Sequence, residues 1–358
     1  MKRLKHVLVT GRTYPTAPRG LALREGLRLQ GVKVSEVTID HKTSRPWGWK
    51  LERRLDQFKE PVDAVILADL GQEVFHPAWR AAQRLGAPLF SDFFFSMHEA
   101  LVHDRAVVGE DSFQARRAHK ADLDTLKLSD ACFFDTREHL RYALNAFPGA
   151  LRRGFVVPIG CPMAFFEEQT PKPLDGWGGF NVLFWGSYIP LQGIEHIIHA
   201  AHALRNEPGI VFHLIGKQGQ TYAAMRDLEQ RLKPGNVRFV DRIDPEKLRS
   251  HIKAADLALG IFGSTPKASR VVPHKVYEAL AMGVPCVSMR SPAMNEWIPR
   301  EACLQVEPST LATSILELRS DETRRRTLGR SGAEFMLKHL HPRELGRILI
   351  EGIEGHSK

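Results

Sequence analysis

The amino-acid sequence predicts an α/β protein with two doubly wound, Rossmann-like domains. Two segments open alike, with an apolar run that ends at a glycine, a loop with proline and glycine, and a helical stretch. The first run covers residues 5–10 and ends at Gly11, and the second covers 181–185 and ends at Gly186. Strand, glycine loop, helix and strand in this order make the βαβ unit of a parallel sheet. A chain of 358 residues is also long for one hydrophobic core.

Further apolar runs, each bounded by turn residues, continue both sheets. They predict strands at 32–39, 63–70, 87–95 and 130–136 in the first half, and at 210–216, 236–240, 256–262, 284–289 and 303–308 in the second. Proline, glycine and charge gather at 165–178, where we place the linker. The predicted domains are 1–168 and 178–340. They are followed by a helix at 341–358 that could pack back across either domain, with the first domain as the one that we assign. Two such domains facing a cleft bind ligands at the carboxyl ends of their strands.

Cysteine use and hydropathy indicate the compartment. The four cysteines, at 132, 161, 286 and 303, form no CxxC pair, which argues against a zinc ribbon and favours buried thiols in a reducing compartment. The apolar run at 7–9 is too short for a signal sequence, and no stretch reaches the length of a membrane span. We expect a cytoplasmic protein, with the inner face of the membrane as a further place of action.

The net charge of +9 favours anionic partners, which are nucleic acid, an anionic membrane face or a phosphorylated substrate. No zinc-finger, helix-turn-helix or RNA-recognition signature supports nucleic acid. A basic and aromatic stretch at 45–60 contains Trp47 and Trp49 beside Lys50 and Arg53. This mixture favours a membrane-interface contact, and the alternative is an ordinary surface loop.

The segment 264–297 is the most informative stretch of the sequence. Pro273 suits a first helical position and Gly283 suits a helix end, so we predict a short helix from about His274. The amides at the start of such a helix can bind an anion. Glu278 lies about one turn in, where a carboxylate can accept hydrogen bonds from two ribose hydroxyls.

Three cations lie just before this helix or in its first turn. They are Lys267, Arg270 and Lys275. In that place they would neutralise a diphosphate bound at the helix start. The alternative is a solvated, capped helix with its charges pointing outward.

The loop at 185–193 is a second candidate. Gly186 and Gly193 permit a close approach of the backbone to a ligand, and the helix that follows would begin at the same edge of the sheet. That helix carries His196, His199 and His202, whose spacing spreads them around its polar side. Because no HExxH motif is present either, we expect no metal site.

The stretch at 90–99 is the candidate in the first domain. Asp92 and His98 follow a strand, where either could act as a base or orient an acceptor. The alternatives are that Asp92 caps a helix and that His98 lies in a turn.

Taken together, these motifs resemble GT-B glycosyltransferases of glycosyltransferase family 4. The resemblance covers nearly the whole chain and is strongest over 180–335. It rests on Gly186, Pro190 and Gly193 before a helix, on Leu214, Ile215 and Gly216 ending a strand, on Asn236, Val237 and Phe239, on Ala255 and Asp256, and on the run 273–287.

The resemblance implies a nucleotide-sugar-binding second domain and an acceptor-binding first domain. Glu278 would hold the ribose, and the backbone near Arg242 and Ile243 would contact the base. The diphosphate would lie against the helix after Pro273 and against loop residues that include Gly186, Ser187, Gln192, Gly193 and Gly216. Gly11 and His98 would lie on the acceptor side. Such enzymes retain the anomeric configuration and use no catalytic metal and no cofactor beyond the donor. The implied acceptor is a glycan, a lipid-linked glycan or another cell-surface molecule.

Three positions depart from the family pattern. Ser187 and Gln192 stand where the family often has Arg and Lys, and Arg270 stands where it often has a second Glu. We hypothesise that Lys267, Arg270 and Lys275 take over the contact with the diphosphate. No acceptor-side His plainly follows the strand at 87–91, and Asp92 is the substitute that we assign there as a catalytic residue.

Other functions remain open at this point. A GT-B epimerase would need acidic and His groups facing the sugar, and no firm set is present. A degenerate protein that binds nucleotide or glycan without turnover is compatible with the departures from the family pattern. A dinucleotide-dependent dehydrogenase would need GxGxxG after the first strand, where the sequence is GRTYPTAPRG.

Overall fold

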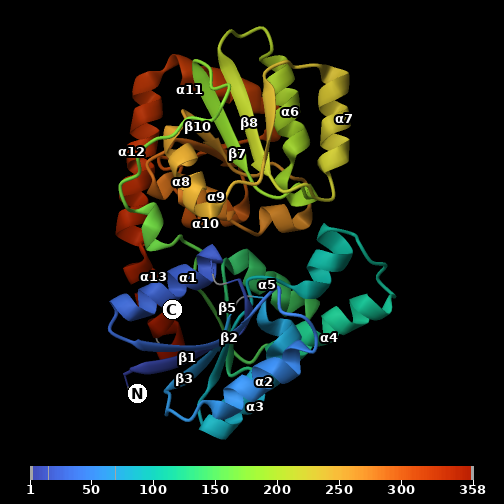
Figure 1. The fold of residues 1–358 in the computed structure, drawn as a ribbon, viewed down its shortest axis with the longest axis vertical. Helices are drawn as coiled ribbons and strands as arrows, with labels where there is room; N and C mark the ends of the chain where they lie inside the picture. Colours follow the sequence, from blue (N-terminus) through green and yellow to red (C-terminus); the bar gives the residue numbers. More distant parts are fainter. Residues whose placement is uncertain (1–2, 15, 69, 356–358) are drawn as a thin grey trace. The chain divides into compact units, whose positions relative to one another are not determined.

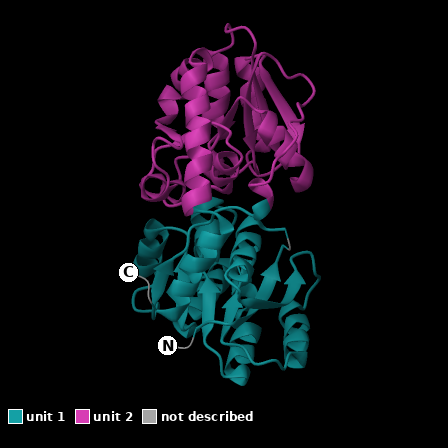
Figure 2. Ribbon diagram, turned by 90° about the vertical axis from the view of Figure 1, so that its left-hand side faces the viewer, with its two compact units in different colours: residues 1–163, 340–358 teal, residues 164–339 magenta. Residues whose placement is uncertain are grey.

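The computed structural model describes residues 3–14, 16–68 and 70–355, and it divides the chain into two compact units. Unit 1 comprises Met1–Met163 with Leu340–Lys358, and unit 2 comprises Ala164–His339 (Figure 2). The chain therefore passes from unit 1 to unit 2 at 163/164, directly before the predicted linker at 165–178, and returns at 339/340.

Unit 1 contains a six-stranded parallel sheet with the order β2-β1-β3-β4-β5-β6 (Figure 1). Its strands are β1 (His6–Thr13), β2 (Lys33–Asp40), β3 (Ala64–Leu67), β4 (Leu89–Asp92), β5 (Ala131–Phe134) and β6 (Gly154–Val156). The sequence did not predict β6, because three residues are too short to show a period. It also placed the end of β1 at Gly11, but the strand continues to Thr13 because Arg12 and Thr13 pair with the end of β2.

The helices of unit 1 are α1 (Pro18–Leu29), α2 (Trp47–Gln57), α3 (Phe75–Leu85), α4 (Phe113–Leu128), α5 (Arg137–Ala146) and α13 (Pro342–Glu354), with 3₁₀ turns at Gly71–Val74 and Met163–Phe165 and a π-helix at Glu99–Asp104. α13 packs on α1 through glycines, since a Cβ added to Gly26 would lie 2.7 Å from the Gly346 nitrogen. This contact places the last helix in unit 1. The basic and aromatic stretch, for which a surface loop was one reading, forms helix α2.

Unit 2 contains a second six-stranded parallel sheet, with the order β12-β11-β10-β7-β8-β9. Its strands are β7 (Phe180–Trp185), β8 (Ile210–Gly216), β9 (Val237–Asp241), β10 (Leu257–Leu259), β11 (Cys286–Met289) and β12 (Leu304–Val306). Its helices are α6 (Ile194–Ala203), α7 (Tyr222–Leu232), α8 (Pro245–Ala254), α9 (His274–Ala281), α10 (Pro292–Trp297), α11 (Leu311–Ser320) and α12 (Glu322–His339), with 3₁₀ turns at Pro190–Gln192, Pro266–Ser269 and Pro308–Thr310.

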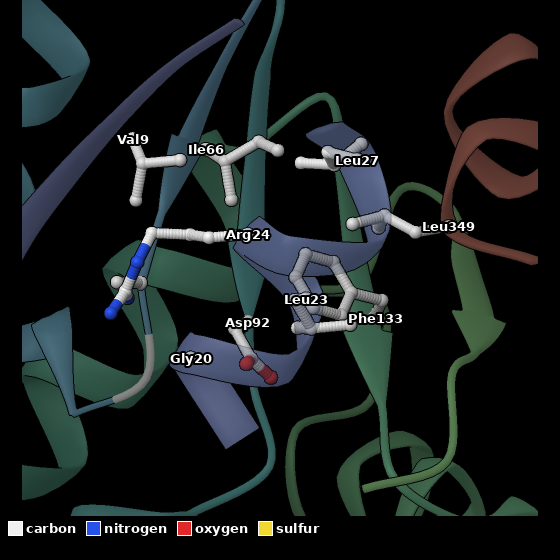
Figure 3. A pocket seen from close by; sticks show the side chains of 10 residues that line it. Val9, Gly20, Leu23, Arg24, Leu27, Ile66, Asp92, Phe133 and Leu349 are labelled. Carbon is white, nitrogen blue, oxygen red and sulfur yellow. The ribbon is translucent and has the colours of Figure 1, made fainter. Parts of the chain in front are cut away.

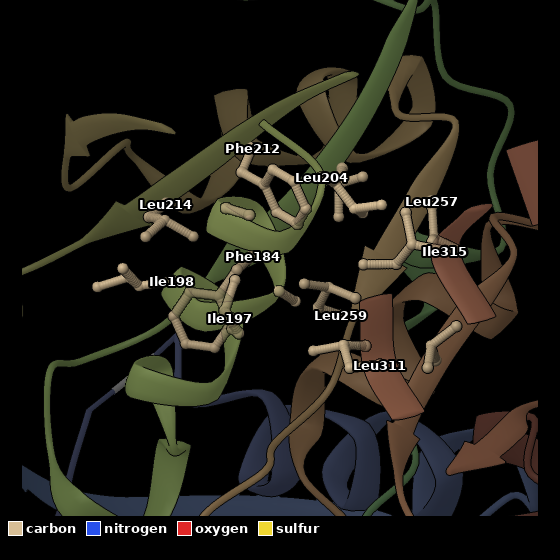
Figure 4. Packing of buried hydrophobic residues seen from close by; sticks show 14 of the residues in the cluster. Phe184, Ile197, Ile198, Leu204, Phe212, Leu214, Leu257, Leu259, Leu311 and Ile315 are labelled. Carbon is tan, nitrogen blue, oxygen red and sulfur yellow. The ribbon is translucent and has the colours of Figure 1, made fainter. Parts of the chain in front are cut away.

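The core of unit 2 forms where α6 and α11 cover the sheet. Ile197 and Ile198 of α6 are fully buried, as are Phe184 and Leu214 of the central strands and Ile315 of α11 (Figure 4). These side chains fix the start of α6, and with it the loop that joins α6 to β7.

Both sheets reverse their winding at one place, next to their first strand. In unit 2 the chain runs from β7 to β8 on one side and later returns to β10 on the other side. In unit 1 the same reversal separates β1 from β3. Ligands of doubly wound folds bind outside the carboxyl ends of the strands at such a reversal. In unit 2 this points to the loops that follow β7 and β10.

None of the helices in the described part of the chain combines the length and the apolarity that a membrane crossing needs.

Candidate functional site

The two loops at the reversal in unit 2 pack against each other through glycine. Gly193 has φ = 63°, and a Cβ there would lie 2.2 Å from the Phe262 carbonyl carbon. A Cβ at Gly263 would lie 2.4 Å from the Leu191 oxygen. Only glycine fits these positions, because a Cβ there would collide with backbone atoms of the facing loop. The contact fixes the loop after β7 against the loop after β10.

Lys275 places a buried cation at this corner. It lies in the first turn of α9 and only 5% of its surface is exposed. Its Nζ donates a hydrogen bond to Gln192 Oε1 and lies 4.1 Å from the centre of the Phe184 ring. A side chain at Gly186 would meet the same Nζ at 3.2 Å, so the ammonium group lies directly over the loop after β7.

Burial has the largest effect on the charge state of Lys275. Burial lowers the pKa of Lys275 to about 7, while the negative charges of Glu278 and Cys286 act in the opposite direction. Within the described ranges, no carboxylate pairs with Lys275, and its polar partner is the neutral amide of Gln192. An anion that enters this corner would therefore gain a charge-assisted hydrogen bond.

Glu278 follows one turn later on α9. It is 6% exposed, and Trp185 Nε1 donates a hydrogen bond of 2.7 Å to Glu278 Oε2. Burial raises the pKa of Glu278, against the effects of the Trp185 hydrogen bond and the Lys275 charge. In the described part of the chain, Oε1 accepts no hydrogen bond. Trp185 thus orients the carboxylate by one oxygen and leaves the other for a ligand.

Trp185 and Phe184 are the contributors that sequence reasoning missed. They are the last two residues of β7, and the sequence analysis gave neither side chain a role, although Trp185 opens the candidate stretch 185–193. The signal was available at Trp185, because a buried indole N–H needs an acceptor and usually finds one.

Lys267 and Arg270 lie between β10 and α9, in and just after the 3₁₀ turn Pro266–Ser269. Both are half-buried, and burial lowers the pKa of Arg270. The predicted helix start at about His274 is confirmed. Pro273 was expected at the first helical position, but its ψ of 147° makes it the N-cap residue, one position earlier.

The other predicted donor-side residues lie on neighbouring loops of unit 2. Gly216 ends β8, and a Cβ there would lie 2.2 Å from the Gly186 oxygen, so it supports the loop after β7. Ser187 is exposed in that loop. Arg242 is exposed and Ile243 half-buried in the loop between β9 and α8. Their contacts with a donor stay predictions.

The histidines of α6 form no metal centre with their neighbours. Over the described residues, no group of three or more His, Cys, Asp or Glu side chains is arranged to hold a metal ion.

Asp92, the predicted catalytic residue of unit 1, forms a buried ion pair. It ends β4, is 4% exposed, and its Oδ2 lies 2.7 Å from Arg19 Nε of α1. Arg19 is fully buried and also donates to the Val157 oxygen at 3.0 Å. Burial raises the pKa of Asp92, and the Arg19 charge lowers it.

A small cavity of about 20 Å³ lies beside this pair, lined mainly by apolar side chains such as Val9, Ile66 and Phe133 (Figure 3). Its volume suits about one water molecule, which needs at least about 10–15 Å³. The cavity is therefore too small for a sugar.

Gly11 and His98 occupy separate places in unit 1. Gly11 lies inside β1 with φ = 139°. His98 precedes the π-helix, and its backbone N–H donates to Asp122 Oδ2 at 2.9 Å. Its ring contacts His103 and His119 edge-on, with centroids 5.5 and 5.3 Å away, and burial lowers its pKa. The acceptor-side assignments of Gly11, Asp92 and His98 stay predictions.

Comparison with known proteins shows what the region around this site is similar to. Residues 179–321 match the family model described as "Glycosyl transferases group 1". Most of unit 2 thus resembles a glycosyl transferases group 1 domain. The matched segment contains both loops at the reversal and all of α9. No curated protein sequence matches the chain.

Solved structures share the fold over nearly the whole chain. Sucrose-phosphate synthase from Thermosynechococcus elongatus has 18% identity and a TM-score of 0.70, covering 98% of this chain and 99% of its own. Anabaena HepE in complex with UDP-glucose has 14% identity, a TM-score of 0.71 and the same coverage. An E. coli structure of "Trehalose-6-phosphate … bound with UDP-2-fluoro glucose" has 12% identity, a TM-score of 0.67 and coverage of 98% and 99%. The chain therefore has the GT-B fold of these proteins, and its residues 179–321 resemble glycosyl transferases group 1.

Proposed function

We propose that the chain transfers a sugar from a nucleoside-diphosphate sugar to a hydroxyl of a glycan, glycolipid or other cell-surface acceptor, with retention of the anomeric configuration. The observation that carries the proposal is the corner formed by Lys275, Gln192 and Gly186, with Glu278 one turn away. It offers a buried cation, a glycine-lined backbone and a carboxylate within one unit. UDP-sugars are the first donors to test, since the similar structures were solved with UDP-glucose and UDP-2-fluoro glucose.

In the proposed mode of donor binding, the diphosphate lies at the start of α9. The amides of its first turn and the Lys275 ammonium group would contact the phosphate oxygens. Glu278 Oε1 would accept hydrogen bonds from the ribose hydroxyls. Lys267 and Arg270 would supply further charge on the same side.

The proposed reaction breaks the bond between the anomeric carbon and the diphosphate oxygen, which keeps the electron pair. The acceptor hydroxyl oxygen bonds to the anomeric carbon on the face that the diphosphate leaves, and its proton passes to the departing phosphate oxygen. The transition state carries positive charge on the sugar and growing negative charge on the diphosphate. Lys275, Lys267 and Arg270 would stabilise that negative charge, and no metal would be required.

A nucleotide-sugar panel tests the proposal. UDP-, GDP-, ADP- and dTDP-sugars are titrated calorimetrically, and slow hydrolysis is followed in the presence of EDTA. We expect one nucleotide to bind and to hydrolyse. Glu278→Ala should weaken its binding by about 10–100-fold, the range for a lost hydrogen bond to a charged group.

The control is Glu301→Ala, which removes an exposed carboxylate of the same unit and should change nothing. With an acceptor in hand, NMR of the product identifies the anomer. Binding without turnover on any acceptor would instead favour a degenerate nucleotide-binding protein. Absence of binding to every nucleotide would refute the proposed site.

A further inference from the structure

Helix α2 has two unlike faces. Leu51 and Leu55 are buried in the core of unit 1, whereas 55% of Trp49 is exposed. An open groove of about 290 Å³ follows the exposed face, from the end of β2 along the side chains of Trp49, Lys50, Arg53 and Arg54. Its volume is near the lower end of small-molecule sites, which span about 300–1,000 Å³.

The groove carries positive charge that no carboxylate matches. The acidic residues of α2 are Glu52 and Asp56, and they pair with α3 instead, through Arg80 at 2.6 Å and Arg84 at 4.0 Å. Within the described part of the chain, no ion pair involves the groove's three cations. α2 therefore directs its negative charge to α3 and its positive charge to the groove.

Neutral groups hold these cations in place. Lys50 Nζ donates to the oxygen and the Oγ of Ser44, both at 3.0 Å, and Arg54 Nη1 donates to the Thr38 oxygen at 2.7 Å. The Arg53 guanidinium lies 4.9 Å from the centre of the Trp49 ring. The side chains are thereby oriented while their charge stays available, which reduces the entropy lost on binding an anion.

The combination of groups specifies the chemistry of the ligand. Arg53 lies over one face of the Trp49 indole, and the exposed remainder of the ring can contact the apolar face of a sugar. Guanidinium and ammonium groups beside it can bind a carboxylate or a phosphate. The concave shape suits a discrete ligand better than the plane of a bilayer.

We propose that the α2 groove, defined by Trp49, Lys50, Arg53 and Arg54, is a binding site for a sugar that bears an anionic group. The site lies within unit 1 and does not depend on the donor site proposed in unit 2. Its function is to retain an acidic saccharide on the protein.

Calorimetric titration of the full chain tests this site. The probes are a trigalacturonate, glucose 6-phosphate, neutral maltotriose and inorganic phosphate. We expect saturable binding of at least one of the two anionic sugars, which also tells carboxylate from phosphate, and weaker binding of maltotriose and phosphate. Trp49→Ala and the pair Lys50→Ala/Arg53→Ala should each weaken binding about tenfold or more.

Matched controls separate the groove from general effects. Phe113→Ala removes another exposed aromatic side chain, and Arg300→Ala/Lys338→Ala removes two exposed cations of unit 2. Neither should change binding. Equal loss in the controls, equal binding of maltotriose, or binding of phosphatidylglycerol vesicles without binding of either soluble anionic sugar would overturn the proposal. If the donor site proposed in unit 2 binds no nucleotide, the test of the α2 groove remains valid, because its probes and variants concern unit 1.

Discussion

Both units contain a six-stranded parallel sheet that reverses next to its first strand, but they differ in strand order and in the partner of a buried cation near the reversal. In unit 1, Arg19 is neutralised by Asp92 at 2.7 Å and lies beside a cavity for about one water. In unit 2, Lys275 has the amide of Gln192 as its partner, and its pKa falls to about 7. The first corner is electrostatically closed, and the second can accept an anion. We therefore expect the side chains around each cation to decide whether an anion can bind at that reversal.

The largest expected effect concerns the Arg19–Asp92 ion pair of unit 1. Asp92→Ala removes the carboxylate that pairs with the buried Arg19 charge, which should lower the free energy of unfolding by about 3–5 kcal/mol. Urea denaturation followed by circular dichroism measures this change.

Two variants make that experiment specific. Arg19→Met/Asp92→Leu removes both charges and should be much closer to the wild type in stability. Asp111→Ala, at an exposed carboxylate, should have no effect. If Asp92→Ala folds with wild-type stability but loses turnover, the comparison fails and Asp92 acts in catalysis.

A smaller effect concerns the pH dependence of donor binding at Lys275 of unit 2. Below pH 7 Lys275 is already protonated in the unbound protein, whereas above that pH a bound anion must draw a proton onto it. Because the donor's diphosphate stays ionised throughout, its dissociation constant should rise by up to about tenfold per pH unit between pH 7 and 9. Titrations in buffers with different ionisation enthalpies report the proton uptake directly.

The control for this dependence is Lys275→Met, in which affinity should be lower and nearly independent of pH. Glu278 and Cys286 are the titratable groups that interact with Lys275. A pH dependence that persists in Lys275→Met would assign it to one of them.

The sequence was sufficient for the parts of the structure that depend on local pattern. Apolar runs that end at glycine located β1 and β7, and the apolar face of the helix after Gly193 located α6. β6 was not predicted because three residues are too few to show a hydrophobic periodicity. The stretch that forms α2 could not be assigned to a membrane contact or a surface loop, because its two tryptophans look alike in sequence. In the structure Trp47 packs on the core and Trp49 does not.

The site was predictable as a set of residues but not as a set of contacts. Gln192 and Lys275 are 83 residues apart, and Trp185 and Glu278 are 93 apart. These side chains meet because the sheet order brings β7 next to β10. That order is not encoded in any local stretch of sequence, so the contacts could not be predicted. The same holds for Arg19 and Asp92, which are 73 residues apart. Asp92 was predicted as a catalytic residue, and the structure shows it in a buried ion pair.

The central claim is that α9, and not the loop after β7, supplies the cation that binds the diphosphate. Titrating the donor into the wild type, Lys275→Met and Lys275→Met/Gln192→Lys tests it most directly. We predict that Lys275→Met weakens binding by about 10–100-fold and that the double variant recovers most of that loss, because a lysine at 192 returns the ammonium group to the same corner. Unchanged binding in Lys275→Met, or no recovery in a double variant with a wild-type circular dichroism spectrum, would contradict the account.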